Sequence, residues 1–219
     1  MTNNLDRSKK NHRIYIICGI IMPILFTLLI IIESLLRPGY SQIHTEISYL
    51  GIGPYSIIQN TNFIISGFLS IAFAIGLGFS ISAHTKQKVK NIIELLLIIF
   101  GVGVTFAGIS LILVSVFTTD YFFYMIHLLA TFVAFFTIII AQILIWWALR
   151  RTKTTIWGYY PKFSLLTGLI SIVMLIIFLY TITSSYQGLT ERLFVAIPLI
   201  WIEVTGLKLY SNNQMKVVG

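Results

Sequence analysis

Side chains that could perform chemistry are few in this chain, and two of them stand close together in an otherwise apolar stretch. Asp120 and His127 are seven residues apart, which on a helix places them on one face, about 10 Å apart along its axis. A histidine that acts as a general base needs an orienting group and a nucleophile within hydrogen-bond reach. Ser48 and Ser115 are the candidate nucleophiles. One hypothesis is therefore hydrolysis, with His127 as the base or as a metal ligand.

A second group of charged side chains lies at the ends of apolar runs and suits the binding of an anion. Glu33 and Arg37 are four residues apart, so on a helix they share a face and are placed to form an ion pair. Arg37 and Arg192 supply guanidinium groups, which bind phosphate and carboxylate oxygens in a bidentate manner. A lipid headgroup or a small solute could therefore bind at this end of the protein. The residues predicted to line such a site are Glu33, Arg37, His44, Asp120, His127, Glu191 and Arg192.

A structural explanation accounts for several of the same residues without any ligand. Asp120 precedes a predicted helix, where an aspartate accepts hydrogen bonds from free backbone N–H groups and interacts favourably with the helix dipole. Glu191 and Arg192 stand at the start of the last apolar run, where they could cap the helix or pair across the mouth of a bundle. Capping, ligand binding and hydrolysis are three open interpretations of these residues.

No metal or cofactor is expected from the sequence. Zinc sites usually have three or four His, Cys or carboxylate ligands, whereas His44 and His127 are the only histidines among the polar groups just described. The sequence contains no His-x-x-x-His pair, no Gly-x-Ser-x-Gly motif and no phosphate-binding loop. Its single cysteine, Cys18, lies inside an apolar run and predicts neither a disulfide nor a Cys-based metal site.

Membrane-spanning helices must position these residues. Hydrophobic residues make up 57% of the 219-residue chain, charged residues only 10%, and the mean hydropathy is +0.91. A membrane helix needs about 20 mostly apolar residues, and six segments qualify: 14–36, 61–83, 92–117, 122–149, 163–183 and 193–210. The sequence therefore predicts an all-α fold, a polytopic transmembrane six-helix bundle. It forms a single domain over 14–210, between a basic tail at 1–13 and a short tail at 211–219.

The basic residues predict the orientation of this bundle. All but two of the 15 lysines and arginines lie in the terminal tails or in the even-numbered loops, and the exceptions are Arg37 and Arg192. By the positive-inside rule, both termini are then cytoplasmic and these two arginines lie on the outer side. The net charge of +8 follows from this topology, so it predicts contact with membrane lipids and no nucleic-acid partner.

The longest connection, 37–60, is predicted to cover the outer end of the bundle. Loops longer than about 15 residues are uncommon in compact domains and are often functional. Ile43, Ile47 and Leu50 have i, i+4, i+7 spacing, which predicts a short amphipathic helix over 41–50 that lies on the outer interface. We expect this segment to act as a lid or plug.

Small residues predict that the second and third spans approach each other closely. Gly67 in the second span and Gly101 and Gly108 in the third carry no side chain that would hold two backbones apart. Simple helix packing is therefore the expected role of these glycines.

Three short motifs resemble a known family. The first is Ile47-Ser48-Tyr49-Leu50-Gly51-Ile52-Gly53, followed by Asn60, Phe63 and Gly67. The second is Phe117-Thr118-Thr119-Asp120 with His127, and the third is Gly188-Leu189-Thr190-Glu191-Arg192, followed by Trp201. Together they resemble the signature of the domain-of-unknown-function 998 family of six-span prokaryotic membrane proteins. The resemblance implies a six-helix membrane fold and no established activity.

The predicted protein is thus a multi-pass protein of a prokaryotic plasma membrane. The leading functional hypothesis is a non-enzymatic protein that binds a lipid headgroup or small amphiphile in an outward-facing polar vestibule. One alternative is a membrane-embedded hydrolase that uses His127 and Asp120, with Ser48 as the candidate nucleophile. The other is a purely structural or partner-binding membrane subunit. Membrane lipids are the expected partners, and the sequence is compatible with a homo-oligomer or with a membrane protein partner.

Overall fold

Six long helices make up most of the molecule. The computed structural model describes residues 2–117, 121–152 and 157–218, and the side chains of those between 11 and 212. The helices are α1 (Thr2–Leu36), α2 (Ser56–Ile81), α3 (Gln87–Val116), α4 (Tyr121–Leu149), α5 (Tyr160–Thr181) and α6 (Gln187–Val218), with a 3-10 turn η1 (Ser48–Gly51). No strand occurs in the described ranges, and all six helices are long and apolar enough to cross a membrane. The prediction of an all-α six-helix membrane bundle is confirmed.

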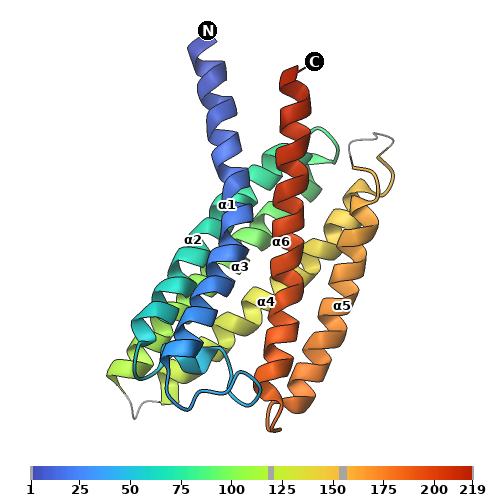
Figure 1. Cartoon of the computed structure of the whole chain (residues 1–219). Helices are drawn as coiled ribbons and strands as arrows, with labels where there is room; N and C mark the ends of the chain where they lie inside the picture. Colours follow the sequence, from blue (N-terminus) through green and yellow to red (C-terminus); the bar gives the residue numbers. More distant parts are fainter. Residues whose placement is uncertain (1, 118–120, 153–156, 219) are drawn as a thin grey trace.

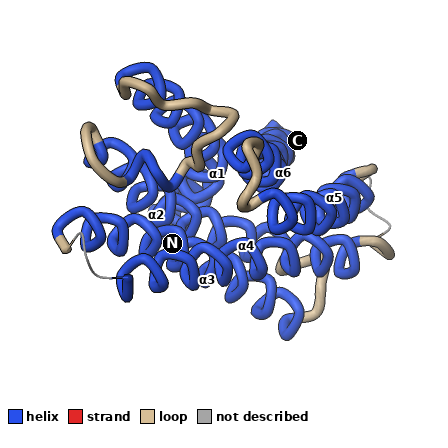
Figure 2. Tube along the Cα trace, turned by 90° about the horizontal axis from the view of Figure 1, so that it is seen from below, coloured by secondary structure: helices blue, strands red, loops and turns tan. Residues whose placement is uncertain are grey.

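The helices form a ring in chain order. Each packs on the next one along the chain, and α6 closes the ring by packing on α1 (Figure 2). Both termini lie at one end of the bundle, which we call the terminal end (Figure 1). The connection between α1 and α2, residues 37–55, lies at the opposite end (Figure 1). We call this connection the long loop and that end the loop end. The cytoplasmic position of the termini stays a prediction from the basic residues.

All six helices begin before the predicted spans, and the early starts of α2 and α6 shape the loop end. α2 starts at Ser56 rather than at residue 61, and α6 starts at Gln187 rather than at residue 193. The added turn of α2 carries Gln59 and Asn60, whose polar side chains are typical of a loop but are buried here. Asn60 Nδ2 donates a hydrogen bond to the Gly51 carbonyl at 3.0 Å, so a polar contact with the long loop replaces apolar packing.

The predicted amphipathic helix over 41–50 is wrong. This part of the long loop forms turns followed by η1. Ile47 and Leu50 are 3% and 0% exposed, so their side chains lie inside the loop end of the bundle instead of on its surface. Only Ile43 of the predicted apolar face is exposed. A helix does not form because the backbone groups of this segment bond to side chains of the long helices, as described below.

The closest helix pair is α2 and α3, as the small residues predict. A Cβ added to Gly67 would lie 2.0 Å from Thr105 Oγ1 and 2.5 Å from the Gly101 carbonyl oxygen. A Cβ added to Gly108 would lie 2.8 Å from the Asn60 carbonyl oxygen. These distances leave no room for a side chain at either glycine.

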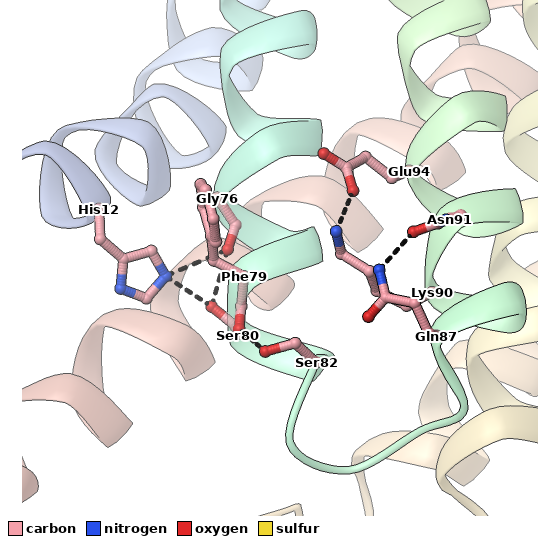
Figure 3. Close-up of polar contacts among 9 residues, drawn as sticks. All are labelled: His12, Gly76, Phe79, Ser80, Ser82, Gln87, Lys90, Asn91 and Glu94. Carbon is pink, nitrogen blue, oxygen red and sulfur yellow. Dashed lines mark hydrogen bonds and ion pairs between the residues drawn. The ribbon is translucent and has the colours of Figure 1, made fainter. Parts of the chain in front are cut away.

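Polar contacts at the terminal end tie α1 to α2 and stabilise the start of α3 (Figure 3). The His12 ring Nε2 lies 3.1 Å from the Gly76 carbonyl and 3.0 Å from Ser80 Oγ, both on α2. On α3, Lys90 Nζ and Glu94 Oε2 form an ion pair at 2.7 Å, one helical turn apart. The side chain of Glu94 is thus paired.

We expect Gly67→Val to destabilise the bundle, because the added carbons collide with the α3 backbone. Overpacking of this kind typically costs about 1–3 kcal/mol. The measurement is thermal unfolding of the purified protein in detergent. Phe68→Leu is the control, since Phe68 is the next residue and its side chain is exposed on the outside of the bundle. Equal melting temperatures for the two variants would contradict the close approach of α2 and α3.

Candidate functional site

Arg192, near the start of α6, holds the first half of the long loop. Its guanidinium donates to the Thr45 carbonyl at 2.9 Å and to the Gly188 carbonyl at 2.8 Å. It also donates to the Tyr40 hydroxyl and lies over the Tyr40 ring, 5.5 Å from its centre. The Tyr40 hydroxyl in turn donates to the Glu46 carbonyl at 2.9 Å. One charged side chain thus organises both ends of the turn that precedes η1.

Backbone contacts bring the same turn directly against α6. The Leu189 N–H donates to the Ile43 carbonyl at 3.0 Å, and the Ile47 N–H donates to a carboxylate oxygen of Glu191. A Cβ added to Gly188 would lie 2.3 Å from the Thr45 carbonyl oxygen. Only glycine therefore allows the long loop to lie this close to the start of α6.

Arg37, just after α1, holds the second half of the long loop. Its guanidinium donates to the carbonyls of Tyr49 at 2.9 Å and Leu50 at 3.1 Å, and also to that of Ile52. It lies over the Tyr49 ring, 4.8 Å from its centre. The expected ion pair between Glu33 and Arg37 is absent from the described residues, because Arg37 binds these carbonyls instead.

The predicted vestibule residues are separated by this arrangement. His44 lies on the exposed side of the long loop, with its ring bonded to the Ser185 carbonyl. Glu33 is buried against α2, and His127 is buried on α4. Asp120 lies outside the described residues. Arg37 and Arg192 place most of their donors on backbone carbonyls, so in this conformation their main contacts are within the protein. The proposed ligand contacts of all seven residues stay predictions.

A small cavity lies in the middle of the helix ring, beneath the long loop. Its volume is about 60 Å³, and its walls come from α1, α2, α3, α4, α6 and the long loop. Apolar side chains dominate the lining, and the polar members are Ser48, Ser66, His127, Thr131 and Glu191. This is space for a few water molecules or one small chemical group.

His127 is oriented within this cavity by a backbone carbonyl. Its Nδ1 lies 3.1 Å from the Ala107 carbonyl on α3, so Nδ1 carries the hydrogen and the neutral ring keeps Nε2 as an acceptor. Ser48 Oγ donates to Glu46 at 3.5 Å, and no hydrogen bond joins His127 to a serine in the part of the chain that the structure describes. His127 and Ser48 therefore line the same cavity, as the hydrolase hypothesis requires, but they do not form a hydrogen-bonded pair of base and nucleophile.

A larger groove runs along the outside of the ring between α1 and α6. It has a volume of about 720 Å³ and extends from Gln42 and Arg192 at the loop end towards Glu203. Between these polar groups, almost all of its wall is aliphatic or aromatic. Four side chains line both the groove and the inner cavity: Phe26, Ile47, Val195 and Leu199. These four residues form a thin apolar wall between the two spaces.

Sequence reasoning missed a polar stripe on α2. Gln59, Asn62, Ser66 and Ser70 follow i, i+3, i+7, i+11 spacing, and all four side chains are buried. That spacing marks one helix face and was readable from the sequence. Thr131, whose hydroxyl is buried without a hydrogen-bond partner, was not singled out either.

No group of three or more His, Cys, Asp or Glu side chains comes together in the described ranges. The polar side chains of the cavity provide at most one histidine and one carboxylate. Such a set is smaller than the ligand sets of zinc sites in proteins.

A family comparison places the chain among known proteins. The model of the family described as "Protein of unknown function (DUF998)" matches residues 20–208. The chain belongs to the DUF998 family. The matched region begins in α1 and ends in α6, so it contains α2 to α5, the long loop and all residues that line the two spaces described above. Comparisons with curated proteins and with solved structures found no match.

Two titratable groups in the long loop of this DUF998 protein have shifted pKa values. Burial raises the pKa of Glu46 above its ordinary value of 4.5, and the hydrogen bond from Ser48 partly opposes the shift. Burial also raises the pKa of the Tyr40 hydroxyl, while the neighbouring Arg192 lowers it. The long loop therefore carries a carboxyl group that resists ionisation.

We expect Arg192→Lys to loosen the long loop of the DUF998 protein, because lysine cannot make the forked contacts to Thr45, Gly188 and Tyr40. A hydrogen bond from a charged group contributes about 1.5–3 kcal/mol, so losing one should increase local opening by roughly tenfold or more. The measurement is the labelling rate of Ile47→Cys, which is buried in the parent, with a membrane-impermeant maleimide. Arg151→Lys, at an exposed position, is the control. An unchanged labelling rate in Arg192→Lys would show that this arginine does not hold the loop.

We expect Glu46→Gln to raise the melting temperature at neutral pH. Because the pKa of Glu46 is higher in the folded state, stability is fully present below about 4.5 and is lost as the pH rises through the raised value. The amide cannot ionise, so the gain should vanish at acidic pH. The control Glu94→Gln breaks an ion pair and should give no gain at neutral pH. A Glu46→Gln shift that is equal at both pH values would refute the expectation.

Proposed function

We propose that this DUF998 protein binds an amphiphilic lipid of the plasma membrane, with an apolar chain in the groove between α1 and α6. The observation that carries the proposal is the groove itself. Its volume of about 720 Å³ falls in the range of about 300–1,000 Å³ that is typical of small-molecule sites. Its apolar walls open to the side of the bundle, where lipid chains surround the helices, so a chain can enter without crossing water.

The polar groups at the loop end favour an anionic headgroup. Gln42 and Arg192 line this end of the groove. Arg192 uses its terminal nitrogens within the protein, but its Nε has no hydrogen-bond partner in the described structure. A guanidinium with one free donor and an exposed amide suits a phosphate oxygen. The headgroup would then lie at the level where the predicted orientation places the outer membrane surface.

The test is native mass spectrometry of protein purified in mild detergent, with identification of any lipid that stays bound. Ile200→Trp should abolish retention, because Ile200 lines the groove and a larger ring there fills it. Ile176→Trp is the matched control, since Ile176 is exposed on α5 and lines neither space. Gln42→Glu should reduce retention of an anionic lipid at least several-fold through charge repulsion.

The outcomes separate the proposal from its alternatives. Retention that is equal in wild type and Ile200→Trp places the lipid elsewhere and refutes the groove. Retention that depends on Ile200 but not on Gln42 supports the chain site and rejects the anionic headgroup. A structural or partner-binding subunit would retain no lipid in any variant.

A further inference from the structure

Glu33 is the buried charged group that the groove and the cavity leave unexplained. It lies in the last turn of α1, its side chain is 0% exposed, and it lines neither space. Both of its carboxylate oxygens lack a hydrogen-bond partner in the described structure. An ionised carboxylate in such surroundings is very costly unless something neutralises it. Its surroundings therefore need a compensating positive charge.

The protein supplies only a weak positive charge near Glu33. Arg37, just after the end of α1, attracts the carboxylate but forms no ion pair with it, because its donors bind the long loop. From α2, the backbone N–H of Gln59 approaches the carboxylate, and the neighbouring side chains Gln59 and Asn62 are uncharged. Arg37 is the one charged group of the described residues that acts on Glu33.

Glu94 at the terminal end shows what a satisfied carboxylate looks like in this protein. It forms an ion pair with Lys90 at 2.7 Å and is partly exposed (Figure 3). Glu33 has neither an ion-pair partner nor contact with solvent. Glu46 and Glu191 also lack an ion pair, but each accepts a hydrogen bond, so Glu33 differs from all three in having neither.

Polar groups surround Glu33 on the α2 side. Asn62 Nδ2 donates to Gln59 Oε1 at 3.3 Å and to the Phe26 carbonyl of α1 at 3.0 Å. Ser66 Oγ donates to Asn62 Oδ1 at 3.3 Å. Gln59 Nε2 and Ser34 Oγ are buried without partners, as Glu33 is. Where α1 faces α2, the acid Glu33 and the amide of Gln59 thus both have unused hydrogen-bonding capacity.

We propose that Glu33 anchors a binding site for a small monovalent cation, a proton or a sodium ion, between α1 and α2. The cation neutralises the carboxylate, and Gln59 on α2, whose backbone N–H approaches the carboxylate, is its polar neighbour. The chain Gln59–Asn62–Ser66 leads from this site to the inner cavity, because Ser66 also lines that cavity. The site is independent of the lipid groove, from which Glu33 is absent.

The test is the thermal stability of the purified protein in lipid nanodiscs as the cation concentration changes. Proton concentration is varied at fixed sodium, and sodium is varied at fixed pH with choline keeping the ionic strength constant. Above its dissociation constant, each tenfold increase in the bound cation should raise the folded-to-unfolded ratio of wild type about tenfold. Glu33→Gln should lose the part of that response that belongs to Glu33 and keep the acid response of Glu46, while Glu94→Gln should keep the full response.

The outcomes identify the cation or overturn the site at Glu33. A Glu33-dependent response to acid alone identifies the proton, and one to sodium at fixed pH identifies the metal ion. A wild type that responds to neither cation, or a Glu33→Gln variant that responds as wild type does, overturns the proposal. If Glu33→Gln fails to fold, Gln59→Leu keeps the acid but removes the amide and should shift the response to higher cation concentration. An unshifted response in Gln59→Leu also overturns the site. None of these readouts depends on retained lipid, so failure of the lipid proposal is distinguishable.

Discussion

The long loop must find hydrogen-bond partners for its backbone at the edge of an apolar bundle, and the rest of the loop end depends on how it does so. Its backbone groups cannot all bond to one another, because turns and a short 3-10 segment leave many carbonyls without a backbone partner. Arg37 and Arg192 bind those carbonyls from two different helices. Their charge therefore stabilises a non-helical segment where an unpaired carbonyl would be costly. Ile47, held between them, can then close both the cavity and the groove.

The two spaces occur where the helices of the ring pack least uniformly. Pro23 in α1 lines the groove and Pro198 in α6 lines the cavity. Each proline removes a backbone donor from its helix and interferes with the preceding turn. By contrast, α2 and α3 approach to glycine contact and leave no space between them. α1 and α6 also approach closely at Gly206, where an added Cβ would lie 3.2 Å from the Gly19 backbone carbon, and the groove lies on the loop-end side of this contact.

Hydropathy was sufficient to predict the six helices and their order, since each span is long and continuously apolar. The same measure placed the starts of α2 and α6 too late, because it treats Gln59, Asn60 and Glu191 as loop residues although α2 and α6 include them. The helix expected over 41–50 failed for a different reason. The spacing of Ile43, Ile47 and Leu50 is compatible with a helix, but Arg192 and Glu191, which bind the backbone of Thr45 and Ile47, lie far away in the sequence. Tertiary partners of this kind leave no local signal.

α1 connects the features of the loop end. Its side towards α2 carries Glu33, its side towards α6 forms one wall of the groove, and Arg37 just beyond its end holds η1. A charge that stays on Glu33 attracts Arg37 away from the loop carbonyls, whereas a neutralised Glu33 leaves Arg37 free to bind them. The observed geometry, with Arg37 on the carbonyls and Glu33 unpaired, is therefore the one expected when the carboxylate is neutralised. The same argument explains why a four-residue Glu–Arg spacing on one helix face does not produce an ion pair in this fold.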